Sequence, residues 1–246
     1  MASGSARGVT TPAPSDYVGT ELEIFAAARN WKRYWSDAIA PFVGGRVLDV
    51  GAGLGATAAV FSSRTGIDAW TCLEPDSRFA AQLATRIAAG GLPARTRARR
   101  GTLRDLDPAE RFDSILYIDV LEHIRDDRGE LARAAGRLAA GGRLVVLSPA
   151  HPFLFSPFDA AIGHERRYTR ASLRAAAPEG LRLARLAYLD AAGFAASLGN
   201  RLVLRSAMPT PAQIAAWDRL LVPISRRLDP WLRFRAGKSV LGVWTR

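Results

Sequence analysis

The stretch that decides the fold is VLDVGAGLG, residues 47–55. An apolar run of β-forming residues leads into three glycines at every second position, and residues 56–61 continue as the start of a helix. The pattern predicts a strand, a tight turn and a helix. Glycines in such a turn let the backbone approach a ligand, and the N–H groups of the helix start face the same point. A nucleoside-bearing ligand is expected here, although Gly51-x-Gly53-x-x-Ala56 also satisfies the dinucleotide-binding fingerprint.

The composition indicates one α/β domain with a basic surface. The chain has 246 residues, of which 48% are hydrophobic, and a formal net charge of +11. Lysine occurs only at Lys32 and Lys238, so arginine carries nearly all of the positive charge. An anionic partner such as nucleic acid or a lipid surface is one interpretation. Because the arginines are spread along the whole chain, we favour a general compositional bias, and a nucleic-acid partner is not expected.

Cysteine usage and hydropathy predict a soluble, cytoplasmic protein. Cys72 is the single cysteine, so neither an internal disulfide nor a thiolate metal cluster can form. It lies in an apolar run, which favours a small buried side chain over a reactive thiol. The sequence has no apolar stretch long enough to span a membrane and no apolar core of a signal peptide.

Strand and helix patterns alternate along most of the chain. Residues 1–20 are predicted to be a disordered tail, and residues 21–246 a single domain that begins with N-terminal helices over 21–45. The predicted strands cover residues 46–50, 69–74, 95–101, 112–118, 143–148, 181–189 and 239–245. Helices are predicted over 56–64, 77–89 and 128–139, the last of them stopped by Gly141 and Gly142. Such alternation indicates a parallel sheet covered on both faces, with a ligand at the carboxyl ends of its strands.

Two segments interrupt this rhythm. Residues 150–170 form an aromatic and basic loop without a clear period, which is typical of a substrate loop. Residues 191–236 are predicted to be a helical insertion, broken by Pro223 and Pro230 into short amphipathic helices with arginine at their margins. We favour a lid that packs on the core over an element that touches a membrane.

Several features together resemble the class I S-adenosylmethionine-dependent methyltransferases. They are Asp49 before the glycines, the spacing of those glycines, the stretch FDSILYIDVLEHI at 112–124, and a seventh strand after a long insertion. The nearest likeness is to the small-molecule and quinone-type branch, known as methyltransferase types 11 and 12, with its VLEHI fourth strand. The resemblance implies a Rossmann-like, doubly wound, seven-stranded and mostly parallel sheet with an antiparallel last strand. It also favours a sulfonium nucleoside over a dinucleotide.

The resemblance implies S-adenosylmethionine as cofactor and assigns its contacts. The glycine loop would approach the methionine part, Glu74 would accept the ribose hydroxyls, and Asp119 would contact the amino group or the substrate. Where the family commonly has an acid near the adenine, this chain has Thr102 and Leu103, with Asp105 as a possible substitute. The predicted cofactor-binding residues are Asp49, Gly51, Ala52, Gly53, Gly55, Glu74, Pro75, Thr102, Leu103, Asp119 and Val120.

Methyl transfer from a sulfonium is an in-line displacement, which needs alignment and exclusion of water but neither a metal nor a covalent nucleophile. A hydroxyl acceptor would use a general base, and the candidate catalytic residues are His123, His151 and His164. A structural role is an equally good hypothesis for each of them. The predicted substrate-binding residues are Trp31, Tyr34, Phe153, Arg166, Arg167 and Tyr168. Asp126 and Asp127 together with His123 and His164 could form a metal site, but adjacent acids after a strand fit a helix cap better, so no metal is predicted.

We therefore expect a methyltransferase that acts on a small, apolar or aromatic acceptor, preferentially at oxygen. Three other interpretations remain. Methylation of RNA would use the basic charge, a non-catalytic cofactor-binding or membrane-associated protein would use the basic insertion, and an NAD-dependent oxidoreductase would use the glycine loop.

Overall fold

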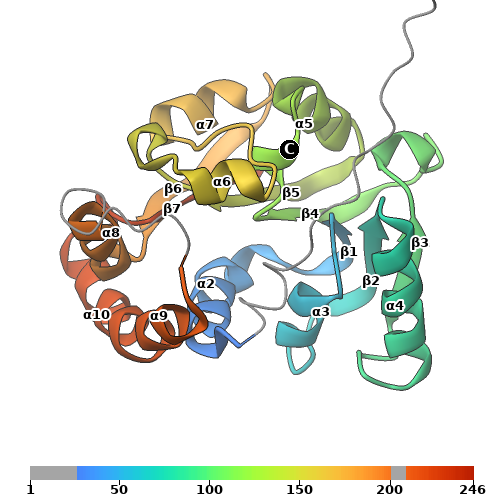
Figure 1. Ribbon diagram of the computed structural model, residues 1–246. Coiled ribbons are helices and arrows are strands. Elements are labelled where there is room, and N and C mark those ends of the chain that lie inside the picture. The colour runs from blue at the N-terminus through green and yellow to red at the C-terminus, as the bar shows by residue number, and fades with distance from the viewer. Residues whose placement is uncertain (1–26, 201–208) are drawn as a thin grey trace, which may run out of the picture.

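The computed structural model describes residues 27–200 and 209–246, so the predicted tail over 1–20 lies outside the described residues. A seven-stranded sheet with the order β3-β2-β1-β4-β5-β7-β6 forms its centre (Figure 1). The strands are β1 (Gly45–Val50), β2 (Ile67–Glu74), β3 (Thr96–Arg100), β4 (Phe112–Ile118), β5 (Leu138–Pro149), β6 (Arg182–Leu189) and β7 (Ser239–Thr245). The first five run parallel, and β7 is antiparallel to both neighbours, β5 and β6. The predicted fold class is confirmed.

Helices cover both faces of the sheet (Figure 1). Above it in the view lie α5 (Asp127–Gly136), α6 (Pro157–Ala161) and α7 (Arg170–Ala176), and below it lie α2 (Arg29–Ile39), α3 (Ala56–Val60) and α4 (Ser77–Ala88). The segment between β6 and β7 contains α8 (Ala191–Gly199), α9 (Pro211–Ala216), the π-helical turn η6 (Trp217–Leu221) and α10 (Val222–Trp231). Short 3₁₀ turns are η1 (Ala40–Phe42), η2 (Leu103–Asp105), η3 (Leu121–His123) and η4 (Pro152–Leu154).

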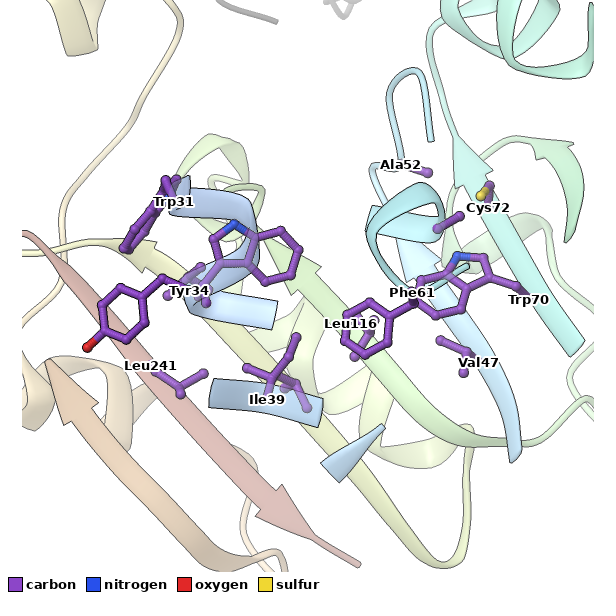
Figure 2. Close-up of a cluster of buried hydrophobic side chains, with 14 of the residues drawn as sticks. Trp31, Tyr34, Ile39, Val47, Ala52, Phe61, Trp70, Cys72, Leu116 and Leu241 are labelled. Carbon is purple, nitrogen blue, oxygen red and sulfur yellow. The ribbon is translucent and has the colours of Figure 1, made fainter. Parts of the chain in front are cut away.

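Successive strand residues supply two separate cores, because side chains alternate between the faces of a sheet. Val47 and Val145 face the core that α2, α3 and α4 cover, where Figure 2 shows Trp31 and Ile39 on one side and the adjacent rings of Phe61 and Trp70 on the other. Their neighbours Leu48 and Val146 face the second core, beneath α5 and α7. A sheet buried on both faces explains why these strands read as continuous apolar runs rather than as alternating ones.

Two helices end earlier than predicted. The helix predicted over 128–139 is α5, which ends at Gly136, and Leu138 already pairs with Phe112 as the first residue of β5. Leu138 is fully buried there, so strand pairing and burial outweigh the helical propensity of the Leu-Ala-Ala sequence. The helix predicted over 56–64 is α3, which ends at Val60.

The prediction that Pro223 breaks the insertion was wrong, because α9, η6 and α10 follow one another without an interruption. The N–H of Val222 bonds to the carbonyl of Trp217, five residues earlier, and Pro223 lies in the first turn of α10. A proline is tolerated in a first turn, where a missing N–H costs little. In the described ranges, no helix has the length and apolar character that crossing a bilayer requires.

Candidate functional site

The candidate site lies at the edge of the sheet where the parallel strands end. The glycine loop follows β1, Glu74 is the last residue of β2, Asp119 follows β4 and His151 follows β5. Parallel strands bring their carboxyl ends to one edge, so residues that are distant in sequence meet there. This is the edge at which the sequence predicts a ligand.

A hydrogen bond joins the glycine loop to the end of β2. The N–H of Gly53 donates to Oε2 of Glu74 at 2.8 Å, and the N–H of Asp76 donates to Oε1 at 2.9 Å. Glu74 is buried, which raises its pKa, and these two backbone bonds act in the opposite direction. A carboxylate has about four acceptor positions, so both oxygens can accept further bonds from a ligand. Pro75, which follows, is exposed.

The loop packs directly against the residue that follows Asp119. Gly51 has a φ of +65°, and a Cβ there would lie 2.8 Å from both γ-methyl carbons of Val120. Its N–H and that of Ala52 donate to the carbonyl of Leu73, at 2.8 and 3.1 Å. Gly55 caps α3 in the left-handed region. Only glycine at position 51 therefore allows β1 and β4 to bring these two segments so close.

Asp119 presents its carboxylate to the open edge. Its backbone has a φ of +53°, and its N–H donates to the carbonyl of Leu147 at 2.8 Å. The side chain reaches solvent, yet the protein packed around it raises its pKa to about 6, while the charges of His164 and Lys238 lower it. A positive φ is uncommon outside glycine and is tolerated best by Asp and Asn. The fold thus holds an acid in a strained conformation beside the glycine loop.

Asp49 lies beneath the loop rather than in it. The side chain is 1% exposed, and the indole N–H of Trp70 donates to its Oδ2 at 3.4 Å. Burial raises the pKa of Asp49 to about 7, and the nearby charge of Glu74 adds to this effect. Its carboxyl group therefore supports β1 and β2 under the loop, and its predicted contact with a cofactor stays a prediction.

The residues predicted near an adenine engage one another at the start of η2. The N–H and the hydroxyl of Thr102 both donate to Oδ2 of Asp105, at 2.8 and 2.9 Å, and the hydroxyl accepts from the N–H of Arg104. These bonds from Thr102 lower the pKa of Asp105, which is exposed. Leu103 is buried together with Leu106 in the second core. The polar pair lies at the surface, whereas Leu103 contributes to packing.

Two of the three histidines form a pair. The rings of His123 and His164 meet edge to face with centroids 4.7 Å apart, and Nδ1 of His164 lies 2.8 Å from Oδ1 of Asp159. Burial and the proximity of His164 lower the pKa of His123 to about 4. Among the described residues, Glu122 completes a set of three possible metal ligands with this pair, whose ligand atoms all lie within 4.8 Å of one another.

His151 lies apart from this pair in an aromatic setting. Its Nε2 is 3.0 Å from the carbonyl oxygen of Gly237, and its ring centroid is 4.7 Å from that of Tyr188 and 4.6 Å from that of Phe194. The exposed ring of Phe153 lies at 5.3 Å. Burial lowers the pKa of His151, although the bond to Gly237 opposes this shift. Since a carbonyl only accepts, Nε2 carries the proton and Nδ1 has a free lone pair in the neutral ring.

The polar groups of Arg166, Arg167 and Tyr168 bind other parts of the protein. Arg167 makes two bonds to the fully buried carboxylate of Asp159, at 2.8 and 2.9 Å. Burial opposes the ionisation of Asp159, but the bonds from His164 and Arg167 outweigh it and lower the pKa. Arg166 and the hydroxyl of Tyr168 both reach Oδ2 of Asp127, at 3.0 and 2.7 Å. These side chains fix the 150–170 loop, and their contact with a substrate stays a prediction.

Trp31 and Tyr34 of α2 are both buried (Figure 2). The hydroxyl of Tyr34 donates to Oδ2 of Asp229 at 2.5 Å, and the ring of Trp31 packs against that of Trp217 with centroids 5.7 Å apart. They therefore attach α2 to the helical insertion. Their predicted role in substrate binding would have to act through this packing.

A lysine that the sequence analysis did not single out completes the edge. Nζ of Lys238, just before β7, lies 4.9 Å from the ring centroid of Trp217, whose indole N–H donates to Asp190 at 2.7 Å. Burial lowers the pKa of Lys238, and the charge of Asp190 partly offsets this. In the sequence, only the position of Lys238 just before the last strand indicates that it could lie at this edge. Its neighbours Trp217 and Asp190 come from distant segments and could not be predicted. A hollow of about 340 Å³ is lined by residues just before α2 and by α9 and η6, Ala28 and Ile214 among them.

Comparisons with known proteins identify the region that contains the loop. The model of a family described as a methyltransferase domain matches residues 48–144. The chain is 33% identical to a ubiquinone biosynthesis O-methyltransferase of Rhodopseudomonas palustris (strain BisB18) over 132 residues, which are 49% of this chain and 46% of the relative. It is 32% identical to a demethylmenaquinone methyltransferase of Tropheryma whipplei (strain Twist) over 152 residues, 58% of each chain. The chain thus spans about half the length of these curated relatives.

Solved structures match nearly the whole chain. Geranyl diphosphate methyltransferase in complex with S-adenosylmethionine has a TM-score of 0.61 and 18% identity, covering 95% of this chain and 92% of the other. A chain of the complex between the Haloferax volcanii Trm112 methyltransferase activator and a putative methyltransferase gives a TM-score of 0.62 and 17% identity, covering 93% and 94%. At such identities the likeness shows a common fold.

Proposed function

Because residues 48–144 match a family described as a methyltransferase domain, we propose that the protein is a class I, S-adenosylmethionine-dependent methyltransferase that methylates an oxygen atom of a small, apolar or aromatic acceptor. The observation that carries the proposal is the bond between Gly53 and Glu74, which sets a buried carboxylate at the base of the glycine loop. The sheet adds support, since an antiparallel β7 lies between β5 and β6, whereas the dinucleotide-binding order 3-2-1-4-5-6 has the sixth strand directly beside the fifth.

The residues at the edge fit an S-adenosylmethionine molecule by their chemistry. Glu74 would accept hydrogen bonds from the ribose hydroxyls, and the loop at Gly51 leaves room that a Cβ would fill. Asp119 would bind the positively charged amino group, which would favour its ionised form despite the raised pKa. Thr102 and Asp105 would supply the polar contacts to the adenine. The bound cofactor supplies a methyl group on an electrophilic sulfonium.

The most suitable general base is His151. The carbonyl of Gly237 holds its Nε2 proton, which leaves Nδ1 to accept the proton of an acceptor hydroxyl. Its lowered pKa keeps the ring neutral near pH 7, as a base requires. His164 instead engages the carboxylate of Asp159, and His123 packs against it. These two histidines are better placed to order the loop than to take up a proton.

A phenolic acceptor suits the surroundings of His151. The rings of Tyr188, Phe194 and Phe153 gather around it, and aromatic side chains favour contact with a flat ring. The relatives named ubiquinone biosynthesis O-methyltransferase and demethylmenaquinone methyltransferase support an aromatic, ring-bearing acceptor. Alignment of the hydroxyl with the sulfonium methyl and exclusion of water would supply most of the rate. We place this reaction in the cytoplasm, since Cys72 is buried and no disulfide is required.

Two measurements test the proposal. Isothermal titration with S-adenosylmethionine should show stoichiometric binding, and NAD should give none; a preference for NAD, or no binding at millimolar S-adenosylmethionine, would refute it. With a panel of catechols and simple phenols, the release of S-adenosylhomocysteine should depend on a free hydroxyl. Turnover with amines but not with phenols would instead reject O-methylation while leaving the cofactor assignment intact.

A further inference from the structure

The helical segment α9–η6–α10 exposes three large apolar side chains. Leu220 is 64% exposed, Ile224 51% and Trp231 79%. Single exposed apolar residues are ordinary on a protein surface, but a set on one element needs a partner. The question is therefore whether these three residues share a face.

Leu220, Ile224 and Trp231 share one face of the helical segment, because their spacing matches the helical repeat. At about 100° per residue in α10, positions 224, 227 and 231 fall within about 60° of one another, and Leu220 lies about one turn earlier, in η6. The opposite side holds the buried residues Asp218, Val222, Ser225 and Asp229. We call the outward set, Leu220, Ile224, Arg227 and Trp231, the outer stripe.

Hydrogen bonds fix the orientation of this helical segment. Asp218 accepts from the N–H of Trp31 at 2.8 Å, and Asp229 accepts from the N–H groups of Asp190 and Ala191 at 2.7 and 3.0 Å. The buried acids of the segment thus face the protein, whereas Leu220, Ile224 and Trp231 face outward. Turning the outer stripe inward would leave these two buried carboxylates without their donors, which is far more costly than exposing apolar surface. The exposure of the stripe is a fixed property of the fold.

The charge around the outer stripe has one sign. Arg219, Arg226, Arg227, Arg233 and Arg235 are all exposed. The acids of residues 209–246 are Asp218 and Asp229, and both are buried. Arg226 pairs with Asp37 at 3.0 Å, whereas the other four have no ion pair with any described residue. The surface therefore presents apolar side chains within a positive field.

We propose that the outer stripe docks the protein on an anionic lipid bilayer. A helix that lies in the interface inserts leucine, isoleucine and tryptophan among the acyl chains, while arginine binds the lipid phosphates. Tryptophan prefers this depth because its ring is apolar and its N–H is polar. A second copy of the chain is a poor occupant, since the same positive face would oppose itself. A nucleic acid would pair with the arginines but leave the apolar residues in water.

Vesicle flotation with the full chain tests this proposal. Wild-type protein should bind vesicles of equal parts phosphatidylglycerol and phosphatidylcholine at least about tenfold more tightly than pure phosphatidylcholine vesicles. L220S/I224S/W231S should weaken that binding about tenfold or more, because it removes the apolar contacts. R219Q/R227Q should weaken it and reduce its salt dependence. The matched control R128Q/R182Q has the same net charge, with both positions exposed elsewhere, and should bind like wild type.

Each other outcome overturns the proposal. Binding that the triple variant leaves unchanged, or that the control weakens equally, would show charge attraction without a docking face. A dimer in analytical ultracentrifugation that the triple variant dissolves, with no vesicle binding, would assign the stripe to a second copy. Circular dichroism checks that the variants fold. Since vesicle binding requires no methyl transfer, its result is separate from that of the cofactor titration.

Discussion

The backbone N–H of Gly53 donates a 2.8 Å hydrogen bond to the buried carboxylate of Glu74, so the loop after β1 and the end of β2 hold each other in place. One carboxylate therefore serves two purposes in the proposed site. It fixes the glycine loop, and its remaining lone pairs would accept hydrogen bonds from the proposed cofactor. Loss of its charge should affect binding before it affects folding.

Replacing Glu74 by Gln should weaken S-adenosylmethionine binding by about tenfold to a hundredfold, because hydrogen bonds to a charged group are worth about 1.5–3 kcal/mol. The amide N–H₂ would also face a donor, the N–H of Gly53 or that of Asp76. Isothermal titration measures the affinity. The exposed Glu179→Gln variant is the control, and equal affinity for all three proteins would contradict the assignment.

Gly51→Ala should destabilise the protein by about 2 kcal/mol or more. The left-handed conformation itself costs about 1–2 kcal/mol with a side chain, and the new methyl would collide with Val120. G51A/V120A should recover part of this loss, since it removes the collision. Urea unfolding of both variants and of the wild type measures these differences in the free energy of unfolding. Gly136→Ala, at the end of α5 where a Cβ meets nothing within 4 Å, should leave stability unchanged or raise it by up to about 1 kcal/mol.

Asp49 should make the protein less stable as the pH rises. Its folded pKa of about 7 exceeds the ordinary value of 3.8, so between these values the native protein holds a proton that the unfolded chain has released. Unfolding free energy then falls by about 1 kcal/mol per pH unit in this window and levels off above it. Asp49→Asn lacks this dependence, so its stability relative to wild type should grow from pH 4 to 7. Thermal melts across this range should show no such trend for the exposed Asp68→Asn.

His151→Asn should lower kcat for a phenolic acceptor by about 10²–10³-fold and leave the S-adenosylmethionine affinity unchanged. The wild-type rate should fall on acidification as His151 becomes protonated, and because burial lowers its pKa, this should occur below pH 6.5. The variant should lose that limb of the pH profile. If His123→Asn removes the limb instead, the base is misassigned.

Arg167→Ala should cost about 3 kcal/mol of stability, because it leaves the buried carboxylate of Asp159 without its bidentate partner. D159N/R167A should be less destabilised than the single variant, since it removes the buried charge. Chemical denaturation compares the two. Unchanged stability together with a raised KM for the acceptor would show that Arg167 binds substrate instead.

The sequence predicts the sheet well because its strands are buried on both faces. The apolar runs around Leu48, Ile115 and Val146 are typical of strands buried on both faces. The glycines that follow Val50 indicate at which edge of the sheet the ligand is expected. The ends of helices were less predictable. Leu138 follows a helical pattern in sequence, and its place in β5 depends on pairing with Phe112, which no local window contains.

The walls of the site were harder to predict for the same physical reason. Arg167 looks available for an anionic substrate until Asp159, eight residues earlier, is seen to bind it. Lys238 and Trp217 meet only because the insertion folds back onto β7. A sequence pattern reports which residues an element buries, whereas these contacts depend on how separate elements pack.

The segment between β6 and β7 begins and ends at one point, because Leu189 and Ser239 are paired neighbours in the sheet. Such an excursion can change in length and composition without altering the register of any strand. It contributes both Trp217, which lies beside Lys238, and the exposed arginines around the outer stripe. Exchange of this one segment between related proteins would therefore alter the exposed apolar and basic surface and the surroundings of Lys238, while Glu74 and the glycine loop remained as they are.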